Sequence, residues 1–175
     1  MYDMRPTTYE EKERADEGRK QMNPNSEHKN PHSIDVLLVE DNLDHVELIL
    51  KVLRENNILN EVHVVSDGEE ALEFLYQRGK YMEAPRPGLI LLDIKLPKMD
   101  GIEVLRRIKA DPALKSIPVV VLTTSIGERE MMESYNLGVN SYIVKPVGFE
   151  EFAKVIKDLK LYWLVVNSLP MKPMS

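Results

Sequence analysis

Short apolar runs alternate along the chain with segments in which apolar residues recur every three or four positions. The runs are typical of strands buried on both faces of a sheet, and they cover residues 36–39, 62–65, 89–92, 118–122 and 141–144. Between the first two runs, Val46, Ile49, Leu50 and Leu53 show the spacing of an amphipathic helix. The same pattern predicts helices that begin near residues 42–44, 68, 101, 128 and 149.

The order of these elements predicts the fold. Strands that are each followed by a helix form a parallel sheet, and right-handed crossovers place the helices on both of its faces. The sequence shows no internal repeat and no second apolar core, so we expect one α/β domain with a doubly wound sheet. A parallel sheet brings the carboxyl ends of its strands to one edge, where such folds carry their chemistry.

The two ends of the chain differ in composition from its middle. Residues 1–33 are rich in charged residues and nearly free of aliphatic ones, so they cannot offset the entropy of ordering by burial. We expect a flexible charged extension over 1–33 with a short helix capped by Thr8 and Glu11, a domain over 34–167 and a tail over 168–175. Apolar residues late in the domain are expected to cover its own surface or a second copy; they are Leu161, Trp163, Leu164 and Val166.

Composition narrows the classes of function. The net charge of −6 gives no support to nucleic-acid binding through a basic face. The absence of cysteine excludes disulfides and thiolate metal sites, and it fits a reducing compartment. No run approaches the roughly 18 apolar residues of a membrane span, and the polar start of the chain is unlike a secretory signal. We therefore expect a cytoplasmic protein that binds neither nucleic acid nor membrane.

Acidic residues follow two of the predicted strands. Glu40 and Asp41 follow the run 36–39, and Asp93 follows the run 89–92, so the three carboxylates are expected to converge at the shared edge. Two such charges about 4 Å apart repel by about 4 kcal/mol at an effective dielectric constant near 20. A divalent cation relieves this repulsion, and oxygen ligands without cysteine favour Mg²⁺. Alternatively, Glu40 and Asp41 only interact favourably with the dipole at the start of the following helix, and Asp93 only caps the following loop.

Two further polar residues end strands at the same edge. Lys145 follows the run 141–144 and can pair with a phosphoryl oxygen as a point charge. Thr123 follows the run 118–122 and offers a hydroxyl donor, although a β-branched residue at a strand end is also common without any role in binding. The histidines predict no competing site, because they are far apart in the sequence or lie in the extension, and each is expected to be solvated or packed; they are His28, His32, His45 and His63.

Together these positions resemble a known family. The set resembles the receiver domain of two-component response regulators over about residues 34–160; it comprises Glu40-Asp41, Asp93, Leu96-Pro97, Met99-Asp100-Gly101, Thr123, Tyr142 and Lys145-Pro146. The resemblance implies a flavodoxin-like (βα)5 fold with strand order 2-1-3-4-5. It also implies that Asp93 accepts a phosphoryl group from a sensor histidine kinase. Mg²⁺ would be held by Glu40, Asp41, Asp93 and the backbone carbonyl of Lys95.

The resemblance also implies a switch and partners. Lys145 and Thr123 would bind phosphoryl oxygens, and movement of Thr123 would let Tyr142 rotate inward, which is expected to alter the surface of the fourth helix, fifth strand and last helix. A half-exposed aromatic without a switching role is the alternative for Tyr142. The loop 81–87 and the long last helix are similar to those of stand-alone regulators paired with phytochrome-type sensor kinases, which dimerise through that surface. The same resemblance favours a cis bond at Lys145–Pro146.

Some positions depart from the family pattern. Lys95 stands two residues after Asp93, where it either tunes the lifetime of an acyl phosphate or reaches solvent, and Ser125 holds the matching place after Thr123. Thr124 is bulkier than usual there and is expected to restrict small phosphodonors. A haloacid-dehalogenase-type phosphatase needs a general acid where Lys95 stands, so we expect no enzyme beyond self-phosphorylation and self-dephosphorylation. A receiver-like scaffold without phosphorylation is disfavoured because the acids and lysine are present.

Overall fold

The computed structural model describes residues 34–55, 61–124 and 127–160. The strands are β1 (Val36–Val39), β2 (Val62–Val65), β3 (Leu89–Leu92), β4 (Val119–Thr123) and β5 (Ser141–Val144). The helices are α2 (Leu43–Glu55), α3 (Gly68–Leu75), α4 (Gly101–Ala110), α5 (Glu128–Asn136) and α6 (Phe149–Lys160). A short 3-10 turn, η1 (Gly79–Tyr81), was not predicted and lies in the connection before β3. All the strands and helices that were predicted within the described ranges are confirmed.

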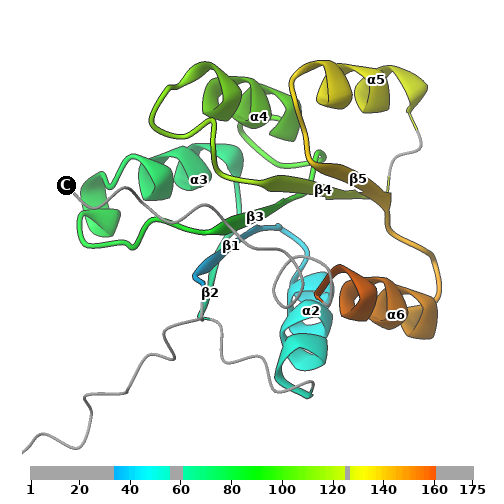
Figure 1. The fold of residues 1–175 in the computed structure, drawn as a ribbon. Helices are drawn as coiled ribbons and strands as arrows, with labels where there is room; N and C mark the ends of the chain where they lie inside the picture. The colour runs from blue at the N-terminus through cyan, green and yellow to red at the C-terminus, as the bar shows by residue number, and fades with distance from the viewer. Residues whose placement is uncertain (1–33, 56–60, 125–126, 161–175) are drawn as a thin grey trace, which may run out of the picture. The chain divides into compact units, whose positions relative to one another are not determined.

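The strands form one parallel sheet in the order β2-β1-β3-β4-β5, as expected. Helices α2 and α6 cover one face of this sheet, and α3, α4 and α5 cover the other (Figure 1). Each crossover helix therefore returns the chain to the same end of the sheet. The carboxyl ends of β1, β3, β4 and β5 consequently meet at one edge, and the loops that follow these strands carry the acids and the lysine singled out above.

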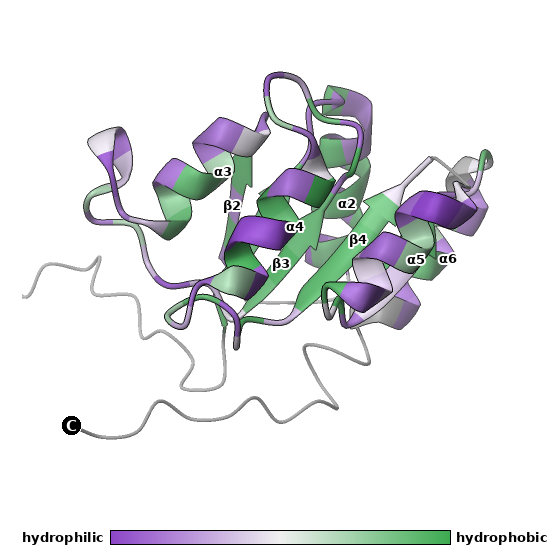
Figure 2. Cartoon of the chain, turned by 90° about the horizontal axis from the view of Figure 1, so that it is seen from above, coloured by the Kyte–Doolittle hydropathy of each residue, from purple (hydrophilic) through white to green (hydrophobic). Residues whose placement is uncertain are grey.

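Alternation along the central strands divides the buried side chains between two cores. One core lies under α3 and α4 and takes Leu37, Val39, Ile90, Leu92 and Val121 from the sheet. The other lies under α2 and α6 and takes Val36, Leu38, Leu89, Leu91 and Leu122. Figure 2 shows apolar strands between helices whose outer surfaces are hydrophilic. Burial on both faces explains why these strands are uninterrupted apolar runs.

Side-chain caps fix where the helices begin at this edge. The Asn42 side-chain oxygen accepts hydrogen bonds from the backbone N–H groups of Asp44 and His45, at 2.9 and 3.2 Å. Asn42 is therefore the cap of α2. At the start of α4, the Asp100 side chain accepts a hydrogen bond from Ile102 N at 2.7 Å. Caps of this kind satisfy backbone donors that a helix leaves unpaired.

Gly101 lies against the backbone of the loop that follows β3. A Cβ atom at this position would lie 2.2 Å from the carbonyl oxygen of Asp93, and Gly101 N donates a hydrogen bond to Ile94 O at 2.9 Å. A residue without a side chain is therefore required for the start of α4 to approach Asp93 so closely.

One expectation about the backbone is wrong. The Lys145–Pro146 bond is trans, because trans is favoured by about 0.5–1 kcal/mol before proline and the trans chain already carries the Lys145 side chain to the acids. The predicted extension and tail, Ser125 and the apolar residues Leu161, Trp163, Leu164 and Val166 lie outside the described residues. Across 34–55, 61–124 and 127–160, each helix is too short or too polar to span a lipid bilayer.

Candidate functional site

The acids predicted to converge do lie together at the carboxyl edge of the sheet. One carboxylate oxygen from each of Glu40, Asp41 and Asp93 lies within 4.8 Å of the other two. Asp93 N donates to Val39 O at 3.0 Å, which continues the pairing of β1 with β3 and sets the position of Asp93. Glu40 and Asp93 are buried, with 2% and 6% of their surface exposed, whereas Asp41 is exposed. The cluster therefore has two buried acids and one acid that is exposed to solvent.

Lys145 brings a buried positive charge to these acids. Its Nζ donates to Asp93 Oδ2 at 2.7 Å and also contacts Glu40 Oε2. The backbone N–H of Lys145 donates to Thr123 O at 2.7 Å, so the end of β5 is held to the end of β4. Only 1% of the Lys145 side chain is exposed. Charges buried this deeply are tolerated because they are paired and hydrogen-bonded.

Backbone amides orient the remaining carboxylate oxygens. Asp93 Oδ1 accepts a hydrogen bond from Lys95 N at 3.1 Å. Glu40 Oε1 accepts one from Asn42 N, also at 3.1 Å. Each buried carboxylate is thus held by the lysine on one oxygen and by its own following loop on the other. Rotation of either side chain would break a charge-assisted hydrogen bond.

His45 also belongs to this site, which the sequence reasoning missed. Its Nδ1 lies 3.2 Å from Lys145 Nζ and 3.4 Å from Glu40 Oε1. The ring packs edge-on against Phe152 of α6, with centroids 5.8 Å apart. A signal was present, because His45 lies in the first turn of the helix that follows Glu40, but Lys145 is 100 residues away along the chain.

Thr123 and Tyr142 occupy neighbouring strands beside the cluster. Thr123 is the last residue of β4 and is fully buried. Tyr142 of β5 pairs with Val121 and is half-buried. Burial raises the pKa of the Tyr142 hydroxyl, and the negative charge of Glu130 raises it further. The negative charge of Asp93 also raises this pKa.

The side chain of Lys95 is directed to α5. Its Nζ lies 2.5 Å from Glu130 Oε1, and 52% of the side chain is exposed. The hydrogen bond to Glu130 raises the pKa of Lys95. Neither of the two expectations for Lys95 included this ion pair, which links the loop after β3 to the first turn of α5. Thr124, the other departure from the family pattern among the described residues, is exposed.

The acid cluster suits a hard divalent cation. Mg²⁺ takes oxygen ligands at about 2.0–2.1 Å and keeps several waters. Glu40, Asp41 and Asp93 supply carboxylate oxygens, and the exposed Asp41 opens the cluster to solvent. Lys145 neutralises part of the charge on the two buried acids. The donor set fits a cation held by a few carboxylate oxygens and completed by waters.

Comparisons with known proteins agree with this geometry. A family model described as the response regulator receiver domain matches residues 36–157. Response regulator Rcp1 of Synechocystis sp. is 44% identical over 145 residues, which are 83% of this chain and 98% of that protein. The crystal structure of the phosphorylated cyanobacterial phytochrome response regulator RcpA matches with a TM-score of 0.77 and 46% identity, over 79% of this chain and 99% of that one.

A second solved structure matches equally well in fold. The Mn²⁺-bound form of response regulator Rcp1 has a TM-score of 0.77 and 44% identity, and the match covers 79% of this chain and 99% of that chain. The order of strands, the family model and these relatives all agree. The chain therefore belongs to the response regulator receiver domain family and is a response regulator of two-component signalling.

Proposed function

We propose that Asp93 is the residue that accepts the phosphoryl group, and that a sensor histidine kinase donates it. The contact of one buried ammonium, Lys145 Nζ, with both Asp93 Oδ2 and Glu40 Oε2 carries this proposal. Such a cation, at a rim that also holds Asp41, suits a carboxylate that must take on further negative charge. The similarity to the phytochrome response regulator RcpA favours a phytochrome-like kinase as the donor.

The residues of the site divide the chemistry between them. A carboxylate oxygen of Asp93 attacks the phosphorus of a phosphohistidine, a P–O bond forms and the P–N bond to the histidine breaks. The ammonium of Lys145 stays beside the acids and stabilises an equatorial oxygen of the phosphoryl group. Lys95 N, which donates to Asp93 Oδ1, holds the carboxylate in place. The hydroxyl of Thr123 supplies a further donor to the phosphoryl group.

We further propose that Mg²⁺ binds to Glu40, Asp41, Asp93 and the backbone carbonyl of Lys95. When bound, this ion screens the negative charges of the acids and of the phosphoryl oxygens. The three acids are close enough to share one ion, since their ligand oxygens lie within 4.8 Å of one another. The Mn²⁺-bound form of Rcp1 supports a divalent cation in a relative.

Phosphorylation would then act on the surface formed by α5, β5 and α6. A phosphoryl group adds negative charge and acceptor oxygens, and Thr123 at the end of β4 would move towards it. Tyr142 would follow into the space beside β4. On α5, 67% of Met132 and 53% of Tyr135 are exposed, and such side chains favour a protein partner or a second copy of the chain. We assign this surface as the output of the switch.

Incubation of the full chain with acetyl phosphate and Mg²⁺ tests the acceptor. Mass spectrometry of the intact protein is expected to show one phosphoryl adduct that is labile to hydroxylamine. The adduct should be lost in Asp93→Asn and kept in Asp44→Asn, a matched change at an exposed acid of α2. An adduct of undiminished yield in Asp93→Asn would overturn the assignment.

The same incubation separates a switch from an enzyme with outside substrates. Lys95 stands where a phosphatase of the haloacid-dehalogenase type has its general acid, and its ammonium is paired with Glu130. We expect phosphorylation and dephosphorylation of Asp93 alone. Continuous release of phosphate from added phosphate esters would contradict this expectation.

A further inference from the structure

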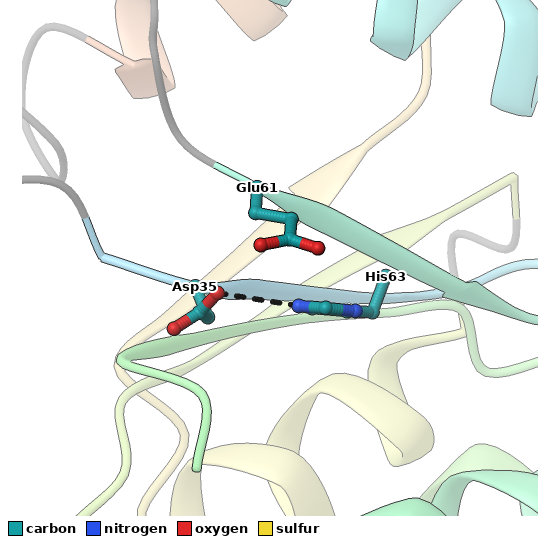
Figure 3. Close-up of side chains that lie close together, drawn as sticks. All are labelled: Asp35, Glu61 and His63. Atoms are coloured by element: carbon teal, nitrogen blue, oxygen red, sulfur yellow. Dashed lines mark hydrogen bonds and ion pairs between the residues drawn. The ribbon is translucent and has the colours of Figure 1, made fainter. Parts of the chain in front are cut away.

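A second group of metal-ligating side chains lies at the opposite, amino end of the sheet. Asp35 precedes β1, Glu61 precedes β2, and His63 is the second residue of β2. The parallel register pairs Leu37 with His63, so Asp35 and Glu61, each two residues earlier, lie side by side. Side chains two apart in a strand point to the same face. Figure 3 shows the three side chains facing one another.

His63 and Asp35 form a hydrogen bond whose length is also the distance between two ligands of a tetrahedral metal ion. His63 Nε2 lies 3.3 Å from Asp35 Oδ1, and one ligand atom from each of the three residues lies within 4.8 Å of the others. Charge-assisted hydrogen bonds between nitrogen and carboxylate are usually shorter, about 2.7–2.9 Å. Two ligands that share a tetrahedral Zn²⁺ with bonds of about 2.0–2.1 Å lie about 3.3–3.4 Å apart.

The backbone already holds the three residues in place. Val36 N donates to Glu61 O at 2.8 Å, and Gly88 N donates to Asp35 O at 2.8 Å. The His63 ring lies against the ring of Phe74 in α3, with centroids 5.2 Å apart. Ligands carried by paired strands and restrained by packing need little reorganisation to bind an ion.

We propose that Asp35, Glu61 and His63 bind one Zn²⁺ ion, with water in the fourth position. An imidazole with two carboxylates is a donor set for Zn²⁺, whereas Mg²⁺ prefers oxygen ligands and suits the acids beside Asp93. The ion would tie the start of β1 to the edge strand β2. The proposal is independent of phosphorylation at Asp93, because the two sites lie at opposite ends of the strands.

Calorimetric titration of the untagged full chain with Zn²⁺ tests this site. The titration is made with saturating Mg²⁺, so that the acids at the carboxyl edge are occupied. We expect one Zn²⁺ per chain and a loss of affinity of about tenfold or more in His63→Gln, because even indirect partners of a ligand contribute that much. His28→Gln, at a histidine of the N-terminal extension, is the matched control and should bind as the parent does. Equal affinity of His63→Gln and the parent would overturn the proposal.

A spectroscopic measurement locates the ion even if His63→Gln folds poorly. In the parent chain, Zn²⁺ is expected to shift the NMR signals of the His63 ring, with assignments made by comparing the histidine variants. Asp35→Asn should reduce this shift at the same Zn²⁺ concentration. Shifts confined to His28, His32 or His45 would place the ion elsewhere and overturn the proposal.

Discussion

Replacing Lys145 with methionine removes a buried cation from between two buried acids. In the parent chain the ammonium lies 2.7 Å from Asp93 Oδ2 and also contacts Glu40. Methionine keeps much of the volume of the side chain but none of its charge. The two carboxylates are then left buried without this partner, and removal of one member of a buried ion pair typically costs about 3–5 kcal/mol of stability.

The separation of the acids gives the size of the mutual repulsion that the ammonium offsets in the parent chain. Carboxylate oxygens of Glu40 and Asp93 lie within 4.8 Å of each other, and at an effective dielectric constant of about 20 they repel by at least about 3.5 kcal/mol. A divalent cation at the same acids would take over the role of the ammonium. We therefore expect Mg²⁺ to stabilise Lys145→Met more than the parent, and so to reduce the loss.

Urea unfolding with and without Mg²⁺ measures both quantities, provided that the slope with denaturant is unchanged. Lys98→Met is the control, because Lys98 pairs with Asp67 at 2.6 Å but is 60% exposed. It should cost far less stability than Lys145→Met, because exposed ion pairs contribute little, and should not respond to Mg²⁺. The reasoning is refuted if Lys145→Met is as mild as the control, or if its loss is the same with and without Mg²⁺.

Three further changes test the surroundings of the site. Gly101→Ala places a Cβ 2.2 Å from Asp93 O; it should cost about 1–3 kcal/mol in urea unfolding and slow phosphorylation by acetyl phosphate. Hydrogen bonds from Lys80 and from a backbone amide lower the pKa of Glu70 from 4.5 to about 2. The ionised Glu70 carboxylate therefore stabilises the fold above pH 4.5, and this stabilisation is lost as the pH falls towards 2. In acid unfolding, Glu70→Gln should lose less stability than the parent between these two pH values. Lys95→Ala should change the rate of dephosphorylation several-fold, measured by loss of the adduct with time.

Each of these changes has a control or a contrary outcome. Gly127→Ala, at the cap of α5, meets only the flexible carboxylate of Glu130 and should cost less than Gly101→Ala. If the two cost the same, the close approach of Gly101 to Asp93 is not the cause. Parallel acid unfolding curves for Glu70→Gln and the parent would contradict the assignment of the pKa. An unchanged lifetime in Lys95→Ala would leave Lys95 with only its ion pair to Glu130.

The sequence by itself predicted the layers and the shared edge that carries the acids, whereas the strand order was implied by the resemblance to receiver domains. A run such as 89–92 is apolar at each position because its strand is buried on both faces. Parallel topology brings the ends of β1 and β3 to the same edge, and their adjacent places in the strand order bring Glu40, Asp41 and Asp93 close to one another. The layers and the shared edge require only local periodicity and the alternation of strands with helices, which are written in the order of the residues.

Other features depended on where side chains point once the layers are packed. The sequence could not show that His45 contacts Lys145, or that Lys95 turns to Glu130, because these pairs are separated by 100 and 35 residues. His63 was likewise expected to be only solvated or packed, yet the register of β1 with β2 places it beside Asp35. Periodicity determines which face a residue occupies, but only packing between elements decides which side chain from another part of the chain it meets.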